Sequence, residues 1–330
     1  MTIDPRASRP TDHPDAQSAT PNAPGGDPEM QAAGQGAPAR PDPSALLDDR
    51  PPSGEMQFGV ISRRQFFGRN ASLVMAVAAA ECISEATHIE TLRYTVPLTG
   101  LKSPIRVVQL TDLHRSIFVT EAYIARVVRM ANALQPDLVL LTGDFISYDT
   151  CYLPSCLRHI AKLNAPLGLY AVLGNHDYAA DAYTGGPKIA EGLRRIGVHM
   201  LIDRSTKLAN GIRLIGLDDV TTQAPCIDAG FQYALPDEPT IVMTHNPQLW
   251  SHELQHRDCL TVCGHTHGGQ INLPLITEIV HPDRTWFLKG WFRRNGLPGR
   301  LYVSRGLGVV NVPMRFRSRP ELTVFDLVPA

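Results

Sequence analysis

A mixed α/β fold built in layers is the fold class that the sequence predicts, on three observations. In the first part of residues 88–330, short apolar runs of strand length alternate with segments of helical periodicity. Later in the same region, hairpin signals take the place of that alternation. The region contains neither an internal repeat nor a linker, so we expect one domain of layered sheets and helices.

The early elements follow from their apolar patterns. Continuous apolar runs predict buried strands over three stretches, residues 105–110, 137–142 and 169–173. Thr120 is a typical helix N-cap, and the apolar residues after it recur at helical spacing. These residues are Ile124, Val127, Val128, Ala131 and Leu134. A second helix is predicted over residues 187–196, followed by a strand over residues 198–202.

The later elements begin with a hairpin. Asn210 and Gly211 lie between two alternating runs and predict a tight turn. Four further strands are expected, over residues 240–244, 259–263, 301–303 and 322–327. A short helix over residues 247–254 is expected to join the first two of these strands.

Composition and charge restrict the class of protein. Of the 330 residues, 43% are hydrophobic and 19% are charged, as in ordinary globular proteins. The formal net charge of −1 argues against a protein built to bind nucleic acid in bulk. The six cysteines show neither a CxxC pattern nor zinc-finger spacing. Cys259 and Cys263 are expected to be small buried residues, whereas Cys151 and Cys156 could pair only in an oxidising compartment.

Residues 1–55 are rich in Pro, Ala, Gly, Asp and Ser and contain almost no large apolar side chains. Such a segment buries too little apolar surface to offset the entropy that it would lose on ordering. We therefore expect the segment to be disordered, or not to be translated at all. In the second case Met56 is the start of the protein.

Residues 56–87 resemble an export signal or a membrane anchor. A pair of arginines and a pair of phenylalanines precede an uncharged stretch over residues 71–80, which is too short to span a bilayer as an ordinary helix. A basic start, a short apolar run and small residues are typical of signal peptides. The paired arginines are similar to a twin-arginine signal, cleaved near Ala80 or retained as an anchor. The alternative is an amphipathic surface helix that carries an arginine pair by chance.

Five short groups of polar residues each follow an apolar strand and offer oxygen or imidazole ligands. They are Asp112-Leu113-His114, Gly143-Asp144, Gly174-Asn175-His176-Asp177, His245-Asn246 and His265-Thr266-His267. A single histidine or a single Gly-Asp turn is weak evidence, because both are common outside functional sites. Five groups at strand ends are stronger evidence, because strand ends on one edge of a sheet bring such residues together.

The last of these groups shows the pattern most clearly. His265 and His267 lie two residues apart, so on an extended strand they would share a face. Residues 259–263 before them are predicted to form a buried strand, and Gly268 and Gly269 after them permit a turn and a close backbone approach. Seven residues of the five groups suit divalent metals of intermediate hardness, such as Mn²⁺, Fe²⁺ or Zn²⁺. They are Asp112, His114, Asp144, Asn175, His245, His265 and His267.

Taken in this order, the motifs DxH, GD, GNHD, H and GHTH closely resemble those of the calcineurin-like metallophosphoesterases. Longer matches are similar to the YkuE/YaeI-type bacterial branch of that family, and they lie at residues 111–114, 244–247, 264–270, 302–308 and 319–321. The resemblance covers about residues 90–328. It implies a four-layer αββα sandwich, in which two mixed β-sheets pack face to face between helices, with the site at one edge.

The resemblance also implies a role for each ligand. The ligands fall into two sets, Asp112, His114 and His267 for one metal ion and Asn175, His245 and His265 for a second. Asp144 resembles the carboxylate that bridges both ions, and the neutral Asn175 adds an oxygen without adding charge. Two cations about 3.5–4 Å apart can clamp the attacking and leaving oxygens of an in-line displacement at phosphorus. A water between them loses its proton near neutral pH, and the hydroxide can attack a phosphoester.

His176 has no ligand role in this scheme. It resembles the family's histidine that contacts the phosphate and protonates the leaving alkoxide, a task that needs a pKa near the working pH. Asn175 and His176 would then both contact the substrate. The alternative for His176 is a structural loop histidine. Asp177 is expected to orient a neighbour or cap the following turn, without a catalytic role.

Basic and aromatic residues interleave between Trp286 and Arg294. Such a mixture suits a membrane interface or a lipid headgroup. The alternative is a packed loop whose rings fill the edge of the core, because Trp is highly buried on average. If the patch is exposed, it favours a lipid-linked phosphoester over a nucleotide as the substrate.

The sequence therefore predicts an enzyme, a dinuclear metal-dependent phosphodiesterase of the cell envelope. The chain lacks the arginine-bearing sequence that follows Gly-Asp in phosphoprotein phosphatases, which argues against protein-phosphatase activity. A second interpretation is a UDP-2,3-diacylglucosamine-type pyrophosphatase of lipid A synthesis, which would be cytoplasmic and membrane-associated. A third is a non-catalytic envelope-binding protein on the same fold. Such proteins typically lose ligands, whereas all seven ligand residues and His176 are present here.

Overall fold

The computed structural model describes residues 63–251, 253–273 and 287–330. The chain divides into two units, Met1–Val60 and Ile61–Ala330, and every described residue belongs to the second unit. The predictions for residues 1–55 and for a start at Met56 therefore lie outside the described residues.

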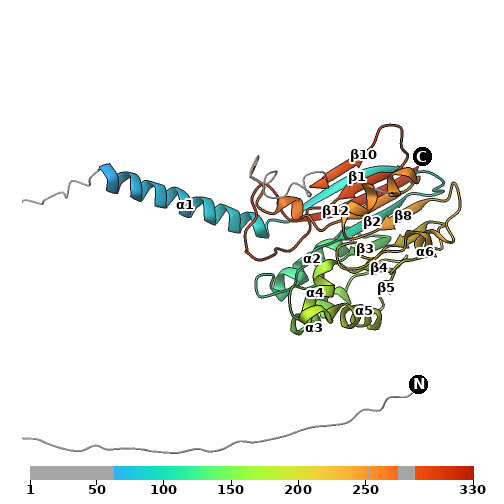
Figure 1. The fold of residues 1–330 in the computed structure, drawn as a ribbon, viewed down its shortest axis with the longest axis horizontal. Helices are drawn as coiled ribbons and strands as arrows, with labels where there is room; N and C mark the ends of the chain where they lie inside the picture. Colours follow the sequence, from blue (N-terminus) through green and yellow to red (C-terminus); the bar gives the residue numbers. More distant parts are fainter. Residues whose placement is uncertain (1–62, 252, 274–286) are drawn as a thin grey trace, which may run out of the picture. The chain divides into compact units, whose positions relative to one another are not determined.

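Among the described residues, two six-stranded β-sheets form the centre of the second unit (Figure 1). The strands of the first sheet are β1 (Glu90–Leu98), β2 (Ile105–Leu110), β3 (Leu138–Thr142), β4 (Leu169–Val172), β5 (His199–Met200) and β12 (Glu321–Pro329). Those of the second are β6 (Arg204–Lys207), β7 (Arg213–Gly216), β8 (Thr240–Met243), β9 (Leu260–Cys263), β10 (Gly290–Arg293) and β11 (Arg300–Val303). The strand orders are β1-β12-β2-β3-β4-β5 and β10-β11-β9-β8-β7-β6, and both sheets mix parallel and antiparallel pairs.

Helices cover the outer face of each sheet, which confirms the predicted layered α/β fold. The first sheet is covered by α2 (Glu121–Ala133), α3 (Leu153–Ile160) and α5 (Gly185–Arg195). The second is covered by α6 (Ile227–Phe231) and two 3₁₀ turns, η3 (Pro247–Ser251) and η4 (Leu254–His256). The remaining helical elements are α1 (Arg63–Thr87), η2 (Thr150–Tyr152), α4 (Asn175–Tyr183) and η5 (His267–Gly269).

Alternation along the central strands divides the apolar side chains between the layers. In β3, Leu138 and Leu140 belong to the core between the two sheets, and Val139 and Leu141 belong to the core under the helices. This division follows from the period of two along a strand, and it explains why strands buried on both faces have continuous apolar sequences.

The parallel strands bring the predicted site together. In the first sheet β2, β3 and β4 are parallel neighbours, and in the second sheet β8 and β9 are parallel neighbours. The two sheets are also linked directly behind the site, because the Gln109 side-chain amide donates to the Cys263 carbonyl oxygen at 3.0 Å. The ends of five strands therefore meet at one edge of the sandwich.

Most predicted elements agree with the structure, and two need correction. Thr120 caps α2 by accepting from the Tyr123 N–H at 3.2 Å, and Asn210 and Gly211 lie in the antiparallel β6–β7 hairpin, as predicted. The helix predicted over residues 247–254 is instead the two 3₁₀ turns η3 and η4, which bury Leu249, Trp250 and Leu254. The strand predicted over residues 198–202 is shorter, because only His199–Met200 pairs with β4.

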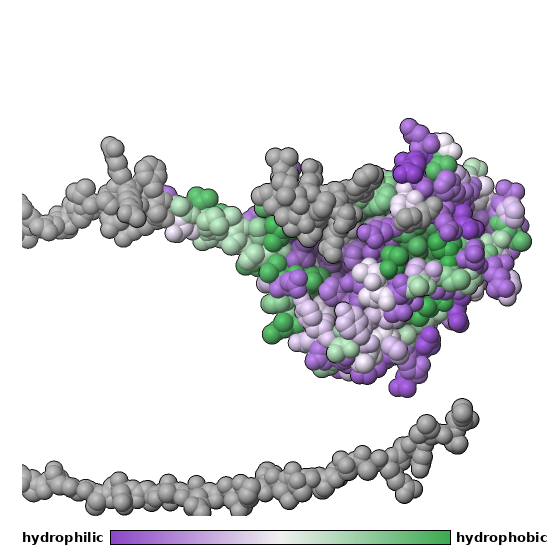
Figure 2. All heavy atoms as spheres, in the orientation of Figure 1, coloured by the Kyte–Doolittle hydropathy of each residue, from purple (hydrophilic) through white to green (hydrophobic). Residues whose placement is uncertain are grey.

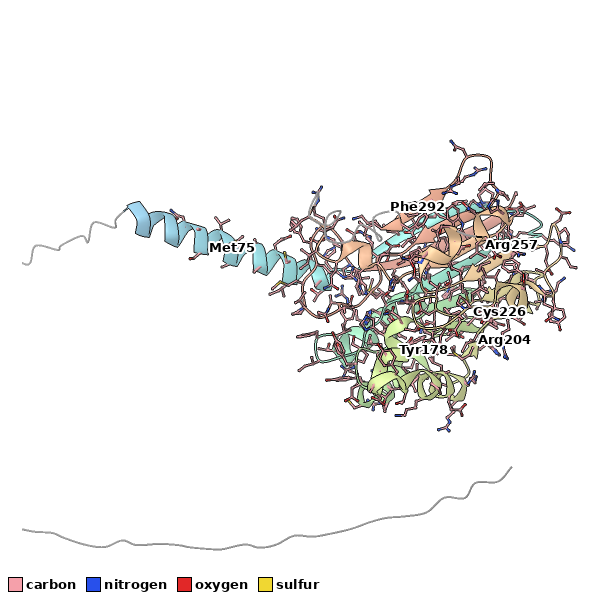
Figure 3. The ribbon with its side chains drawn as sticks, in the orientation of Figure 1. Met75, Tyr178, Arg204, Cys226, Arg257 and Phe292 are labelled. Atoms are coloured by element: carbon pink, nitrogen blue, oxygen red, sulfur yellow. The ribbon has the colours of Figure 1, made fainter. Side chains whose placement is uncertain are left out.

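Helix α1 runs through the stretch that resembles a signal. It continues past Ala80, and its last turns join the domain, where the Glu85 carboxylate accepts from the Ser318 N–H at 2.8 Å. Several of its apolar side chains are exposed, among them Leu73, Val74 and Met75, the last of which is labelled in Figure 3 (Figures 2 and 3). Within the described residues, no helix combines the length and apolar character needed to cross a membrane.

The described part of the basic and aromatic patch combines packed and exposed side chains. Trp286 lies outside the described residues. Phe292 packs against Phe287 at a ring-centroid distance of 5.1 Å, whereas Trp291 remains 39% exposed while its ring contacts Tyr94 and Tyr302. The patch therefore both fills the edge of the core and presents an aromatic ring to the surface.

The cysteines are free thiols in the described part of the chain. Cys259 and Cys263 are fully buried in the core outside the second sheet, as expected for small apolar residues. Cys151 is exposed, whereas the buried Cys156 thiol donates to the Phe145 carbonyl oxygen.

Candidate metal centre

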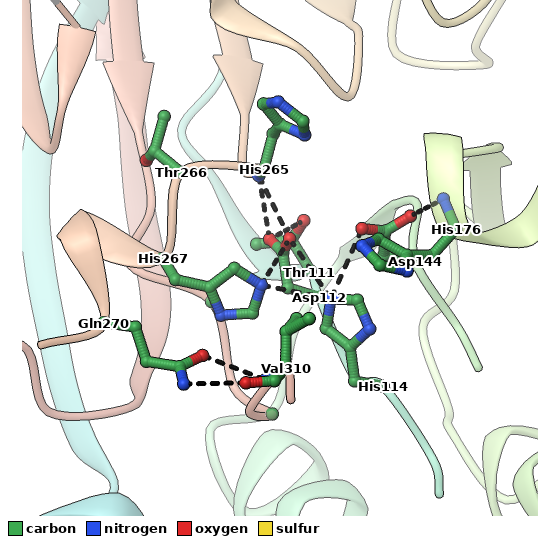
Figure 4. A network of polar contacts seen from close by, with 12 residues as sticks. Thr111, Asp112, His114, Asp144, His176, His265, Thr266, His267, Gln270 and Val310 are labelled. Atoms are coloured by element: carbon green, nitrogen blue, oxygen red, sulfur yellow. Dashed lines mark hydrogen bonds and ion pairs between the residues drawn. The ribbon is translucent and has the colours of Figure 1, made fainter. Parts of the chain in front are cut away.

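The structure brings all seven predicted ligands together at the strand ends. Figure 4 labels Asp112, His114, Asp144, His265 and His267 among them. Four of them follow their strands by two residues, Asp112 after β2, Asp144 after β3, His245 after β8 and His265 after β9. Asn175 begins α4 just beyond β4, and His267 lies in η5. Asn175 and His265 are partly exposed and the other five are buried, so the cluster is closed on the protein side and open at His265.

The first ligand set is Asp112, His114 and His267. The His267 Nε2 atom lies 3.3 Å from Asp112 Oδ1 and 3.0 Å from His114 Nε2. The His114 Nε2 atom lies 3.9 Å from the same Asp112 oxygen. Two imidazole nitrogens and a carboxylate oxygen therefore converge on one point, as the ligands of a metal ion do.

The second ligand set is Asn175, His245 and His265. The His265 Nδ1 atom lies 2.9 Å from Asn175 Oδ1 and 3.3 Å from His245 Nε2. His265 is held in place through its backbone, because its N–H donates to both carboxylate oxygens of Asp112 at 3.0 and 3.1 Å. The two sets are thus linked through the backbone of one ligand.

A single oxygen atom joins the two sets. Asp144 Oδ2 lies 3.3 Å from His114 Nε2 of the first set and 3.1 Å from His245 Nε2 of the second. The other oxygen, Asp144 Oδ1, accepts from the His176 N–H at 2.9 Å, which orients the carboxylate. The Asp144 carboxylate therefore lies between the two predicted ligand sets.

The donor chemistry of the cluster fits a bound cation. His245 Nδ1 is 2.8 Å from the Thr142 carbonyl oxygen, so this nitrogen carries the proton and donates. In the neutral ring, Nε2 then presents a lone pair to the lone pairs of Asp144 Oδ2. Either a proton or a metal cation between these atoms relieves the repulsion, and a backbone carbonyl on the outer nitrogen is the usual partner of a metal-binding histidine.

The pKa values of the buried side chains also indicate that the cluster favours a bound positive charge. Burial opposes charging of His245, yet the Asp144 carboxylate raises the pKa of His245 to about 10. Burial would raise the pKa of Asp144, but His245 and His114 hold that pKa well below its usual value. Asp112 differs, because burial raises its pKa. A buried carboxylate that stays ionised among histidines attracts any cation that reaches it.

Several ligands occupy a backbone conformation that non-glycine residues rarely adopt. The φ angles of Asp112, His114, Asp144, His265 and His267 are 53°, 46°, 57°, 73° and 51°. Such left-handed conformations are unfavourable for side chains of this kind and are typical of functional sites. In this conformation the chain turns directly after the strand, and the side chain points into the cluster. Surrounding contacts hold these residues in place.

Asp177 fixes the turn between two of the ligands. Its carboxylate accepts from the backbone N–H groups of Gly174 at 3.0 Å, Asp144 at 2.8 Å and Phe145 at 2.8 Å. Burial and the nearby Asp144 raise the pKa of Asp177 to about 7. The position of Gly174 shows how tight this turn is, because an added Cβ would lie 2.2 Å from Asp144 Oδ1. Asp177 therefore orients a neighbour, as the sequence predicted.

His176 lies where the cluster opens to solvent. A pocket of about 280 Å³ is lined by Asn175, His176, His265, Thr266, His267, Gly269, Gln270, Leu288, Val310 and Asn311. The His176 ring packs edge-on against His114 at a centroid distance of 4.8 Å. A ring nitrogen of His176 also lies within 4.8 Å of ligand atoms of His114 and Asp144. The imidazole can therefore reach a group bound at the cluster.

Three further side chains support the cluster, although the motifs did not identify them as part of the site. Ser147 places its hydroxyl 3.0 Å from His114 Nδ1. Gln270 holds the wall of the pocket, because its amide bonds both the N–H and the carbonyl oxygen of Val310 at 2.9 Å (Figure 4). Arg315 approaches His267 Nδ1 from within the core at 3.2 Å. Ser147 and Gln270 lie beside the motifs, but nothing in the local sequence marks Arg315.

Comparison with known proteins gives a consistent result. The family described as calcineurin-like phosphoesterase matches residues 105–275, which is just over half of the chain. The chain is 29% identical over 285 residues to the uncharacterized metallophosphoesterase YkuE of Bacillus subtilis (strain 168), covering 81% of this chain and 98% of that protein. It is 28% identical over 286 residues to the phosphodiesterase YaeI of Escherichia coli (strain K12), covering 82% of this chain and all of that protein.

A third relative bears a different name. The chain is 27% identical over 270 residues to the UDP-2,3-diacylglucosamine pyrophosphatase LpxG of Chlamydia trachomatis, covering 66% of this chain and 82% of that protein. The matched residues include every ligand of the cluster, whose buried carboxylates and imidazoles can hold a metal ion. The chain therefore belongs to the calcineurin-like phosphoesterase family, as a metal-dependent phosphoric ester hydrolase.

Proposed function

We propose that the protein is a phosphodiesterase that uses two divalent metal ions, Mn²⁺, Fe²⁺ or Zn²⁺. The observation that carries this proposal is the position of Asp144 Oδ2, within 3.3 Å of one ligand set and 3.1 Å of the other. One ion would be held by Asp112, His114 and His267, and the other by Asn175, His245 and His265, with Asp144 contacting both. Bound there, the ions would supply Lewis acidity to a phosphoryl oxygen and lower the pKa of water.

The side chains around the cluster would complete the reaction. His176 lines the pocket and would hold a phosphoryl oxygen, then donate its proton to the leaving oxygen. Asn175, whose side-chain oxygen is hydrogen-bonded to His265, would help to orient the substrate. Leu288 and Val310 give the same pocket an apolar wall, which suits the organic group of an ester.

Hydrolysis of phosphodiesters is the expected result of a substrate assay. The full chain, reconstituted with Mn²⁺, Fe²⁺ or Zn²⁺, should hydrolyse bis-p-nitrophenyl phosphate and glycerophosphodiesters faster than p-nitrophenyl phosphate or a phosphopeptide. The physical reason is that the pocket has an apolar wall for a second ester group, whereas the chain reads Phe145-Ile146-Ser147 where protein phosphatases carry an arginine-bearing motif. Release of p-nitrophenol measures the two nitrophenyl substrates in separate assays, release of the phosphomonoester product measures the glycerophosphodiesters, and release of inorganic phosphate measures the phosphopeptide. A preference for phosphomonoesters would overturn the proposal.

The similarity to LpxG favours one second candidate, a pyrophosphatase acting on a UDP-linked acylated sugar. The bond broken would again be a phosphorus–oxygen bond, so the same cluster would serve. The substrate assay separates the two candidates when it includes UDP-2,3-diacylglucosamine. If UMP is released from this compound much faster than any diester is cleaved, the second candidate replaces the first.

We also propose that the protein acts in the cell envelope. The motif of paired arginines before the 71–80 stretch supports export, and a lipid-linked phosphoester and membrane contact through residues 286–294 would fit that location. Fractionation of cells that express the tagged full chain should place it with the periplasm or the membrane, and Arg63→Lys with Arg64→Lys should leave it in the cytoplasm. A cytoplasmic, membrane-associated wild type that is insensitive to both substitutions would favour the pyrophosphatase.

A further inference from the structure

Arg315 is the largest side chain that is fully buried among the described residues. Its guanidinium donates to backbone carbonyl oxygens, reaching Arg305 at 2.8 Å, Ser318 at 2.7 Å and Gly308 at 2.6 Å. It also donates to the carbonyl oxygens of Gly306 at 3.2 Å and His267 at 3.5 Å. Backbone dipoles therefore surround the cation on several sides.

This buried cation has no acidic partner in direct contact. None of the ion pairs within 4.0 Å among the described residues includes Arg315. Burial lowers the pKa of Arg315 to about 10, so the guanidinium is still charged near neutral pH. An unpaired buried charge costs stability compared with an apolar side chain of similar volume, so packing alone does not account for it.

The contacts of Arg315 connect two members of the first ligand set. On one side, its Nη2 atom lies 3.2 Å from His267 Nδ1 and its Nη1 atom bonds the His267 carbonyl oxygen. On the other side, it bonds the loop of residues 305–308, which packs on Asp112. In that loop the Gly308 N–H donates to the Asp112 carbonyl oxygen at 2.6 Å, and a Cβ on Gly306 would lie 2.7 Å from Asp112 Cβ.

Arg315 restrains His267 through its backbone, because Nη1 donates to the His267 carbonyl oxygen at 3.5 Å. A histidine that binds a metal ion through Nε2, the atom facing Asp112 and His114, keeps its proton on Nδ1, so the 3.2 Å approach of the guanidinium to Nδ1 is not counted as a hydrogen bond. Ser318 adds a second restraint, because its hydroxyl donates to the His267 carbonyl oxygen at 2.5 Å. Within the described residues, Arg315 forms no hydrogen bond to a ligand of the second set.

From these contacts we infer that Arg315 is a positioning residue for one of the two cations, the ion held by Asp112, His114 and His267. It fixes the His267 backbone and the Asp112 loop in the relative positions that this ion needs, and within the described residues it contacts no ligand of the Asn175–His245–His265 set. The inference rests on the proposed use of two ions. It assigns a functional reason to the largest fully buried side chain among the described residues.

The test is Mn²⁺ binding by the full chain carrying Arg315→Lys, which keeps the charge and loses the planar fork of donors. Equilibrium dialysis followed by elemental analysis should show two Mn²⁺ ions in the wild type. In the variant, one ion should bind as before and the other about 10–100-fold more weakly, the usual effect of removing a partner behind a metal ligand. Arg213→Lys is the matched control, because Arg213 is 9% exposed, bonds Glu238 and lies in β7, and it should keep both ions.

Combination with ligand variants identifies the affected ion. When Arg315→Lys is combined with His267→Ala, it should weaken Mn²⁺ binding no further than His267→Ala alone. When Arg315→Lys is combined with His245→Ala, it should remove the ion that His245→Ala leaves bound. Should Arg315→Lys fail to fold, Ser318→Ala carries the test, because it removes only the hydroxyl bonded to His267 and should weaken the same ion. Thermal unfolding in EDTA shows which variants fold.

Three results would decide against the inference or against its premise. If Arg315→Lys and Ser318→Ala both bind the two ions with wild-type affinity, Arg315 does not position the metal ligands. Equal weakening of both ions would show a general structural role instead. If the wild-type protein binds fewer than two Mn²⁺ ions, the proposed two-ion function is wrong, whatever the result for the Arg315 variant.

Discussion

Asp144→Asn should abolish hydrolysis of bis-p-nitrophenyl phosphate, with a loss of about 10³-fold or more in kcat/KM. Asp144 Oδ2 lies close to an imidazole nitrogen of each ligand set, and its charge holds His114 and His245 in position. The amide has nearly the same shape as the carboxylate, so it fits the tight space beside Gly174. What it lacks is the negative charge that the cations require. Rate and metal content of the same preparations measure the effect.

A matched control distinguishes this loss from general damage. Asp228→Asn makes the same chemical change at an exposed carboxylate in the first turn of α6, away from the strand ends that form the site. It should keep wild-type activity and metal content. Undiminished turnover in Asp144→Asn, with both metals retained, would contradict the bridging position of this carboxylate.

His176→Ala should keep both metal ions and slow the reaction by about 10²–10⁴-fold, the usual contribution of general acid catalysis. The ring lies in the wall of the pocket, within 4.8 Å of ligand atoms of His114 and Asp144, but the proposed ligand sets do not include it. The backbone N–H that orients Asp144 remains in the alanine variant. The effect should be larger for an alkyl phosphodiester than for bis-p-nitrophenyl phosphate, because nitrophenolate leaves with little need of a proton.

The measurement is kcat over a range of pH for both leaving groups, together with metal content. His256→Ala serves as the control, since His256 is an exposed histidine in η4. If His176→Ala reacts at the normal rate at every pH, His176 has no part in the mechanism. If the variant loses metal, the role of His176 is to hold the ions and not the substrate.

The strand ends and their ligands could be predicted because both signals are local. A run such as residues 138–142 is apolar throughout because both of its faces are buried, and the Gly143-Asp144 turn follows it directly. Parallel neighbours then place several such turns at one edge. In this way a simple pattern along the chain leads to the relative positions of residues far apart in sequence.

Other features could not be predicted because their causes are not local. Strand β1 exposes or half-exposes most of its residues, so it lacks the apolar run that marks the central strands, and it is specified by pairing with β12. Helix α4 begins with Asn175 and His176, whose residue types are typical of a loop, and its capping box uses Asp177. Arg315 donates to backbone carbonyl groups. Because every residue has such a group, the sequence contains no pattern that predicts the partners of Arg315.

The order of strands in the first sheet has a consequence for when the enzyme becomes competent. Strand β12, the last of the described strands along the chain, lies between β1 and β2 and pairs with β1 along its whole length. The strand that leads into Asp112 therefore has a free edge until residues 321–329 have been synthesised. We expect Asp112 to reach its final position beside the ligands of the second sheet only once β12 is in place.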